Sequence, residues 1–357
     1  MNFVKRAKIL VSICLVVFIS CKKDEPTKPD PPQEQPSLSA LHTQGRWFLN
    51  EQDDKVLLRG VNIPSLEWTA SGDNMLQSVD HMIHVWGCNV LRIPLSQDRW
   101  YGYGPEQTDD GSAYRRLVEA IIKNGNEKGA YILLDLHWSN GNQWGEYIGQ
   151  HIMPDENSLT FWRDVATLYK NHPAVLFGLY NEPYGIDWDI WRNGGEVNEY
   201  YNRNNEDVNI TYRAVGHQEL YEVIRETGAD NIVIAGGIDW GYDVSGILNG
   251  YALDGYNIAY DTHPYPWKDE NWDGKWGDVG EHYPIIVGEW GLNKEEAGHQ
   301  QYGINITQYM RRKKFCWAAW CLHPSAGPQL IKDWNYTPTW FGELTLRELA
   351  APVDLED

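Results

Sequence analysis

Short apolar runs alternate with amphipathic stretches along most of the chain, and this rhythm constrains the fold more than any other feature. Eight runs have the length and composition of buried strands: "VLLRGVN" (56–62), "NVLRIP" (89–94), "YILLDLH" (131–137), "VLFGLYNE" (175–182), "NIVIAGG" (231–237), "IAYDTHPY" (258–265), "PIIVGEW" (284–290) and "FCWAAW" (315–320). Continuous apolar strands that alternate with helices indicate a parallel sheet covered on its outer face. Eight such strands predict a closed (β/α)8 TIM barrel of the α/β class.

The stretches between the runs have helical periodicity and carry residues that typically begin or end a helix. Helices are predicted at 73–87, 113–129, 158–173, 216–228 and 297–313. Asp73 and Ser158 are predicted N-caps, and three helices should end at glycines, namely Gly87, Gly129 and Gly228. Residues 46–58 predict an N-terminal β-hairpin with its turn near Asp53 and Asp54, which we expect to close the bottom of the barrel.

Residues 1–20 are predicted to be a signal peptide, because basic residues precede an apolar run at 9–19. This run of eleven residues is too short to span a membrane. The pattern ends at Cys21 and resembles a bacterial lipoprotein signal, in which the cysteine becomes the acylated N-terminus after cleavage. An ordinary cleaved signal with an incidental cysteine is the alternative. We therefore expect a protein of the cell envelope that a lipid anchors to a membrane.

Residues 21–37 contain five prolines and almost no apolar side chains, so they are predicted to form a disordered tether. Asp24 and Glu25 resemble the surface-export signals of bacterial lipoproteins, which suggests the outer face of the outer membrane. The barrel is assigned to residues 38–357, a normal length for this fold.

Charge and cysteine content exclude several classes of function. The net charge of −20 argues against nucleic acid or an anionic membrane surface as a partner, since both need basic patches. The sequence has neither CxxC pairs nor an HExxH motif, so no metal and no cofactor are expected. Cys88, Cys316 and Cys321 are expected to be free thiols. Cys316 and Cys321 flank a predicted strand, and two extended residues five positions apart lie about 16 Å apart, which is too far for a disulfide. An odd number of cysteines also leaves no complete disulfide framework.

The aromatic composition indicates the kind of ligand. The chain has 18 Trp and 21 Tyr but only 7 Phe, so most aromatic rings carry a polar group. Such rings suit positions where one face or edge is wet. Sugars, with apolar faces and hydroxyl rims, fit these surfaces, whereas the alternative is a core that is rich in tryptophan.

Polar and amphipathic side chains stand at the ends of most predicted strands. They are Arg92, His137, Trp138, Asn181, Glu182, His263, Tyr265, Glu289 and Trp320. In a (β/α)8 barrel the active site lies at the C-terminal ends of the strands, so these residues should converge. Two carboxylic acids, Glu182 and Glu289, are what hydrolysis of a glycosidic bond needs. The alternative is that Asn181 and Glu182 only mark where a strand meets water.

The motifs "LYNEP" (179–183), "VGEWG" (287–291), "LRIP" (91–94), "DLHW" (135–138), "HPY" (263–265) and Trp320 resemble those of glycoside hydrolase family 5, the cellulase family of clan A. The resemblance covers about residues 45–345 and makes 38–357 the catalytic domain. It implies that Glu182 is the general acid and later the base, and that Glu289 is the nucleophile of a retaining mechanism. Retention requires carboxyl groups about 5–5.5 Å apart, against about 6.5–9.5 Å for inversion.

The resemblance also implies roles for the neighbours of the two acids. Arg92 and Tyr265 would hold the nucleophile ionised and aimed, and Asn181 would bind the 2-hydroxyl of the sugar. His137 and His263 would line the subsite of the reacting sugar, and Trp320 would form its floor. Further sugar contacts are expected from aromatic residues on the loops: Trp68 first, then Trp138, Trp144, Trp267 and Trp240, with Trp188 and Trp191 as a wall on the leaving-group side.

The resulting prediction is a retaining, endo-acting hydrolase of β-1,4-glucan, of the cellulose or mixed-linkage type. A polysaccharide is the expected partner, and we expect a monomer. A β-mannanase or xyloglucanase of the same family is the nearest alternative, because the motifs determine the mechanism and not the sugar. A non-catalytic glycan-binding lipoprotein is the alternative from another class. It would need neither Glu182 nor Glu289.

Overall fold

The computed structural model describes residues 38–203 and 206–356, with the side chains of 201–206 left out. The predicted signal peptide 1–20, the acylated Cys21 and the tether 21–37 lie outside the described residues and stay predictions. Among the described residues, no helix combines the length and the apolar character needed to cross a membrane.

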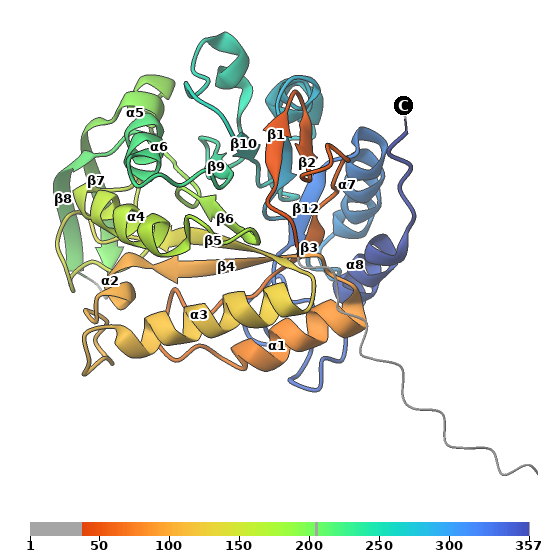
Figure 1. The fold of residues 1–357 in the computed structure, drawn as a ribbon, viewed down its shortest axis with the longest axis horizontal. Helices are drawn as coiled ribbons and strands as arrows, with labels where there is room; N and C mark the ends of the chain where they lie inside the picture. The colour runs from red at the N-terminus through yellow and green to blue at the C-terminus, as the bar shows by residue number, and fades with distance from the viewer. Residues whose placement is uncertain (1–37, 204–205, 357) are drawn as a thin grey trace, which may run out of the picture. The chain divides into compact units, whose positions relative to one another are not determined.

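Eight parallel strands close into a barrel, which confirms the predicted fold (Figure 1). Their order around the barrel follows the chain: β3 (Arg59–Asn62), β4 (Val90–Ser96), β5 (Tyr131–Trp138), β6 (Val175–Gly178), β9 (Val233–Gly236), β10 (Ile258–Asp261), β11 (Ile285–Val287) and β12 (Cys316–Ala319). The barrel closes where β12 pairs with β3, with Ala318 opposite Gly60. Each strand overlaps one of the eight apolar runs, because strands buried on both faces need continuous apolar sequence.

Side chains on the inner face of the barrel change character from the bottom to the top. Val90 and Leu133 belong to an apolar cluster that fills the lower barrel together with residues of the other strands. Successive side chains alternate between the faces of a strand, so the next inner residues are Arg92 on β4 and Asp135 on β5. The barrel is therefore apolar at its base and charged toward the C-terminal ends of its strands.

Helices surround the strands on the outside (Figure 1). The five predicted helices are observed as α1 (Met75–His81), α3 (Ser112–Glu127), α4 (Glu156–Tyr169), α6 (His217–Glu226) and α7 (His299–Lys313), and α8 (Trp340–Ala350) follows the last strand. The end of the first predicted helix is a π-helical turn, η1 (Met82–Trp86). Short α2 (Gln97–Trp100) and α5 (Trp188–Asn193), and the turns η2 (Ser245–Asn249), η3 (Asp273–Gly277) and η4 (Val279–Glu281), were not predicted.

Two predicted N-caps are wrong. Asn74, not Asp73, is the N-cap of α1, and its side chain makes no capping hydrogen bond. Asp155 caps α4, and Ser158 is the third residue of the helix, where its hydroxyl oxygen accepts a hydrogen bond from the Asp155 backbone N–H. The two residues form a capping box, in which the Asp155 side chain accepts from the Ser158 backbone N–H in return.

The N-terminal hairpin consists of β1 (His42–Gln44) and β2 (Trp47–Leu49). Its turn lies at 45–46 and was not predicted. A second turn follows at 50–54, where Leu49 and Lys55 form an antiparallel bridge, so the predicted turn near Asp53 and Asp54 is observed. Phe48 packs in the apolar cluster of the lower barrel. The hairpin therefore closes the barrel bottom, as predicted.

A second hairpin, β7 (Gly195–Arg203) and β8 (Glu206–Ala214), lies between β6 and α6 and was not predicted. Figure 1 shows it at the edge of the molecule, outside the barrel. Its inward side chains Val197, Ile210, Tyr212 and Ala214 form a small separate cluster with Ile152 and Met153, here called the hairpin core. The hairpin thus packs on the segments that follow β5 and β6.

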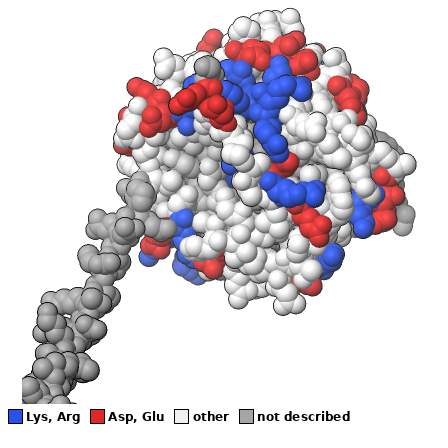
Figure 2. Space-filling view, turned by 90° about the vertical axis from the view of Figure 1, so that its right-hand side faces the viewer, with Lys and Arg blue, Asp and Glu red and all other residues white. Residues whose placement is uncertain are grey.

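Acidic and basic side chains mix on the surface despite the net charge. Figure 2 shows a face where Lys and Arg gather and Asp and Glu border them. Near the end of α7, Glu281 contacts both Arg46 (2.7 Å) and Lys313 (2.9 Å). Such exposed pairs contribute little to stability, about 1 kcal/mol at most.

Candidate active site

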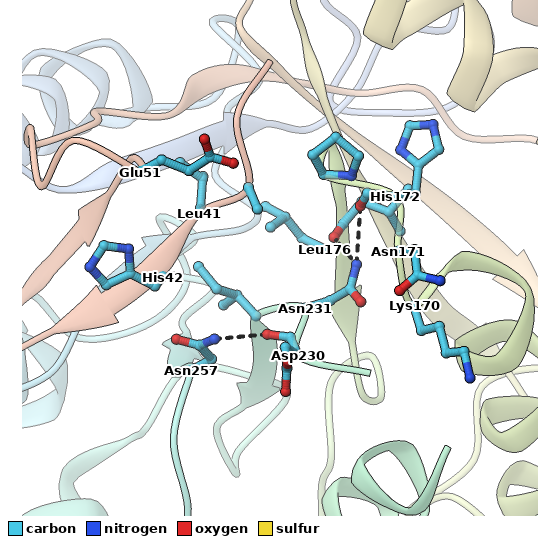
Figure 3. A pocket seen from close by; sticks show the side chains of 14 residues that line it. Leu41, His42, Glu51, Lys170, Asn171, His172, Leu176, Asp230, Asn231 and Asn257 are labelled. Atoms are coloured by element: carbon cyan, nitrogen blue, oxygen red, sulfur yellow. Dashed lines mark hydrogen bonds between the residues drawn. The ribbon is translucent and has the colours of Figure 1, made fainter. Parts of the chain in front are cut away.

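A pocket of about 480 Å³ opens at the C-terminal ends of the strands. Its lining includes seven of the predicted site residues: His137, Glu182, Trp240, Tyr265, Trp267, Glu289 and Trp320. Lys268, Gly327 and Pro328 complete the lining. A pocket of about 530 Å³ lies at the other end of the barrel (Figure 3), where Pro173, Asn231 and Asn257 precede β6, β9 and β10. None of the site residues that the sequence predicts is among the residues that line this second pocket.

Glu182 and Glu289 face each other in this pocket. Glu289 follows β11 by two residues and is 4% exposed, whereas Glu182 follows β6 by four residues and is partly exposed. One oxygen of each carboxylate and one nitrogen of His263 all lie within 4.8 Å of one another. The two acids, 107 positions apart in the sequence, are therefore close enough to act on the same atom of a bound molecule.

The backbone at Glu182 is strained. Its φ of 48° lies in the left-handed region, which non-glycine residues rarely adopt, and Pro183 follows directly. Gln150 holds this turn, because its side-chain amide donates to the carbonyl oxygens of Asn181 (2.8 Å) and Glu182 (3.3 Å). Strain of this kind persists only where the surroundings impose it, and it is common at functional sites.

The Glu289 carboxylate is held at both oxygens. Arg92 donates to Oε1 and the Tyr265 hydroxyl donates to Oε2, each at 2.7 Å. Burial disfavours the charge on Arg92, but Asp135 and Glu289 outweigh that effect and raise the pKa of Arg92 above its ordinary value. A permanent cation and a hydroxyl donor therefore hold both oxygens of the Glu289 carboxylate in place.

Arg92 organises a wider network in the barrel mouth. Its guanidinium also contacts Asp135 at 3.0 Å, and donates to the side-chain oxygens of Asn181 (2.7 Å) and Asn62 (2.8 Å). Burial raises the pKa of Asp135, but Arg92, His137 and His263 together outweigh burial and the net shift is downward. Because the Asn181 oxygen faces Arg92, its amino group is left to face Gln150 and His137.

His263 lies between two carboxylates. Its Nδ1 is 2.9 Å from Oε1 of Glu182 and its Nε2 is 3.1 Å from Oδ2 of Asp261. Burial disfavours the imidazolium, but the charges of Glu289 and Asp261 outweigh burial and raise the pKa of His263 to about 10. His263 is therefore a cation at neutral pH that touches Glu182.

His137 and Trp320 form another wall of the pocket. The two rings stack with centroids 5.3 Å apart and an angle of 8° between their planes. Asp135 accepts a hydrogen bond from Nδ1 of His137 at 2.7 Å and so fixes the imidazole. Burial lowers the pKa of His137, but the hydrogen bond to Asp135 and the charges of Asp135 and Glu67 together outweigh burial, and the net shift is upward.

The predicted tryptophans separate into several groups. Trp267 lines the pocket, is 62% exposed, and stacks on Tyr265 with centroids 4.4 Å apart. Trp138 instead lines a neighbouring depression of about 520 Å³. Trp144 packs against Tyr101 and Tyr103 (centroids 5.2 Å), and Trp68 against His323 (5.5 Å). These three rings are not among the residues that line the pocket of Glu182 and Glu289.

The expectation that Trp191 forms a wall of the site is wrong. Its side chain is fully buried on α5, and its indole nitrogen donates to the carbonyl of Gly236 at 2.7 Å. Trp188 packs edge-on against Trp191 and is part of the same core. The amphipathic turn of α5 therefore points both rings inward.

Several residues of the site were missed from the sequence. Asp135 and Asp261 each stand two positions before a predicted histidine, on the same face of the strand. Asn62 ends β3 in the same layer and donates to the carbonyl of Gly288 at 2.8 Å. The period of two residues along each strand could have revealed all three. Gln150 lies on a loop where no such period exists.

We expect the stability of the protein to depend on pH through His263. A raised pKa means that the imidazolium contributes stability fully below its ordinary pKa of about 6.5 and loses it as the pH rises toward about 10. Between pH 7 and 10, the free energy of unfolding should therefore fall by a few kcal/mol more in the wild type than in His263→Asn. Urea denaturation at several pH values measures this difference.

The control is His84→Asn, which changes an exposed histidine. Parallel pH profiles for wild type and His263→Asn would contradict the prediction.

Comparison with known proteins agrees with this geometry. The model of the cellulase family, glycosyl hydrolase family 5, matches residues 49–326. An endoglucanase of Paenibacillus polymyxa is 23% identical over 84% of this chain and 83% of that protein, and endoglucanase N of Pectobacterium atrosepticum is 25% identical over 63% and 43%. The chain thus spans less than half of the second relative.

The β-glucanase SdGluc5_26A of Saccharophagus degradans shares the fold, with a TM-score of 0.67, 24% identity, and coverage of 90% of this chain and 97% of that one. Since the family model covers most of the sequence, the chain belongs to the cellulase family, glycosyl hydrolase family 5, and is a glycosyl hydrolase.

Proposed function

We propose that the protein hydrolyses β-1,4-glucan of the cellulose or mixed-linkage type, in an endo-acting and retaining manner. The observation that carries the proposal is the pair Glu182 and Glu289, whose oxygens approach within 4.8 Å while Arg92 and Tyr265 fix one of them. This separation suits retention, for which the carboxyl groups stand about 5–5.5 Å apart. An inverting enzyme needs about 6.5–9.5 Å to admit a water molecule.

We assign a role to each acid. The Glu289 carboxylate attacks the anomeric carbon and forms a glycosyl ester, while Glu182 gives its proton to the departing glycosidic oxygen. In the second step Glu182 takes a proton from water, the resulting oxygen attacks the anomeric carbon, and Glu289 leaves as a carboxylate. Arg92 and Tyr265 keep the Glu289 carboxylate aimed for its attack.

The neighbouring side chains provide the subsite of the reacting sugar. We assign the contact with the 2-hydroxyl to the amino group of Asn181, which lies beside His137 while Arg92 holds the oxygen; such a contact strengthens in an oxocarbenium-like transition state. Trp320, backed by His137, forms the floor. The indoles of Trp240, Trp267 and Trp320 give the pocket the amphipathic walls that a neutral sugar chain needs.

Two observations on relatives support a glucan as the substrate. The relatives reported above are named endoglucanases, and a solved structure of the similar β-glucanase contains cellotetraose. A β-mannanase or xyloglucanase remains the alternative within the family. No feature of the pocket favours a non-catalytic binding protein, because binding alone needs neither two facing acids nor the strained turn at Glu182.

A substrate panel tests the proposal. Purified protein should release reducing sugar from carboxymethyl-cellulose and mixed-linkage glucan faster than from mannan, xylan or xyloglucan. A rapid fall in viscosity relative to the reducing ends formed would show endo action. Proton NMR of the first product should show the β-anomer, and an initial α-anomer or a preference for mannan would contradict the proposal.

A further inference from the structure

The β7–β8 hairpin is not part of the barrel, yet it supports the wall of the pocket beside Glu182. Tyr184 and Ile190, which follow Glu182 in the chain, pack against the hairpin core. Ile152 and Met153, from the loop after β5, are members of that core. The hairpin therefore lies behind two loops that both reach the active site.

Glu199 of β7 places a buried carboxylate between these two loops. It is 2% exposed; Oε2 lies 2.8 Å from Nδ1 of His151, and Oε1 accepts a hydrogen bond from the Tyr184 hydroxyl at 2.8 Å. Burial lowers the pKa of His151, but Glu199 outweighs it and the net shift is upward. A buried ion pair is costly to desolvate, so its presence in a peripheral hairpin calls for an explanation beyond stability.

Tyr184, which Glu199 holds through its hydroxyl, connects the hairpin to the pocket. Its ring stacks on Trp240 with centroids 3.8 Å apart and an angle of 4° between the planes. Trp240 lines the pocket and is 43% exposed, so one side of the stack is backed by protein and the other is open. The stack forms a flat aromatic surface next to Glu182.

The backbone that presents Trp240 is strained. Asp239 and Trp240 have φ values of 57° and 59°, an unusual conformation for two successive residues other than glycine. The turn is held on both sides, because Trp240 N–H donates to the carbonyl of Pro183 (2.9 Å) and Lys268 binds Asp239 (2.9 Å). A bulky, exposed indole held in this way points to a function for its free face.

We propose that Glu199 is a positioning residue for recognition of the leaving-group sugar. Through the Tyr184 hydroxyl it fixes the ring on which Trp240 stacks, and Trp240 then receives the sugar whose oxygen Glu182 protonates. This inference rests on the proposed function, because the side of the site is assigned by the role of Glu182. Glu199 itself touches no substrate, so its effect depends on whether a sugar occupies the leaving-group side.

Two substrates separate this role from a general loss of structure. Cellopentaose places sugars on the leaving-group side, whereas β-cellobiosyl fluoride releases only fluoride and places none there. Tyr184→Phe removes the hydroxyl but keeps the ring and the His151–Glu199 pair, so it should fold normally. Glu199→Ala removes the carboxylate that binds the Tyr184 hydroxyl, and Tyr184→Ala removes the ring on which Trp240 stacks. Glu196→Ala is the matched control, because Glu196 is an exposed acid on the same strand.

For cellopentaose, KM should rise about threefold in Tyr184→Phe and kcat/KM should fall about tenfold in Tyr184→Ala and Glu199→Ala. For β-cellobiosyl fluoride, kcat/KM should stay within about twofold of wild type in every variant, and Glu196→Ala should match wild type on both substrates. Equal losses on the two substrates, or wild-type kinetics of Tyr184→Ala on cellopentaose, would overturn the inference. A wild-type protein that hydrolyses neither substrate would overturn the proposed function, and this inference with it.

Discussion

Glu289→Ala should lower kcat on carboxymethyl-cellulose and cello-oligosaccharides by about four orders of magnitude or more, because the variant lacks the group that forms the covalent intermediate. Arg92 and Tyr265 then face an empty space instead of a carboxylate. Steady-state rates measured by reducing-sugar release test the change. Turnover equal to that of the wild type would contradict the assignment of Glu289.

The identity of the nucleophile needs a more specific measurement than loss of activity. In Glu289→Ala, azide can occupy the space left by the carboxylate and attack from the same face of the sugar. With 2,4-dinitrophenyl β-cellobioside, azide should therefore restore turnover and give α-cellobiosyl azide. Glu289→Gln is the structural control, because it keeps the shape of the side chain and an oxygen for Arg92. It should unfold near the wild-type temperature and remain inactive.

The barrel could be predicted because its physical cause is local. Strands buried on both faces require apolar runs, and the glycines after the helices mark the turns, so element order and closure followed from the sequence. The helix starts were less certain. Asp155 and Ser158 both favour an N-cap, and only the backbone geometry, extended at Asp155 and helical at Ser158, decides between them. The β7–β8 hairpin was missed although Val197, Ile210 and Tyr212 alternate with polar residues.

The acids of the site could be predicted because barrel strands end at a common mouth. Glu182, Glu289 and Arg92 therefore meet, although long stretches of sequence separate them. Contacts between loops are harder to predict, because no periodicity relates Gln150 to Glu182 or Glu199 to Tyr184. The same limit explains Trp191: its position in the chain, close to Glu182, suggested the pocket, whereas α5 directs it into the core.

Glu182→Ala should have an effect that depends on the leaving group, which a nucleophile variant would not show. A glycosidic oxygen leaves slowly without a proton, so kcat/KM on cellopentaose should fall about 10²- to 10⁴-fold. 2,4-Dinitrophenolate leaves without a proton, so the first step on its β-cellobioside should proceed at a rate near that of the wild type. Stopped-flow measurement should show a burst of dinitrophenol followed by slow turnover, because the second step lacks its base.

Azide distinguishes the two acids through the configuration of the product. In Glu182→Ala, Glu289 still forms the glycosyl ester, and azide needs no base to displace it from the opposite face. Added azide should therefore speed turnover and yield β-cellobiosyl azide, the anomer opposite to that expected from Glu289→Ala. If the two variants gave the same anomer, the roles assigned to the two acids could not both be correct. Opposite anomers require that Glu182 and Glu289 lie on opposite faces of one sugar, and the gap of less than 4.8 Å between their oxygens allows that arrangement.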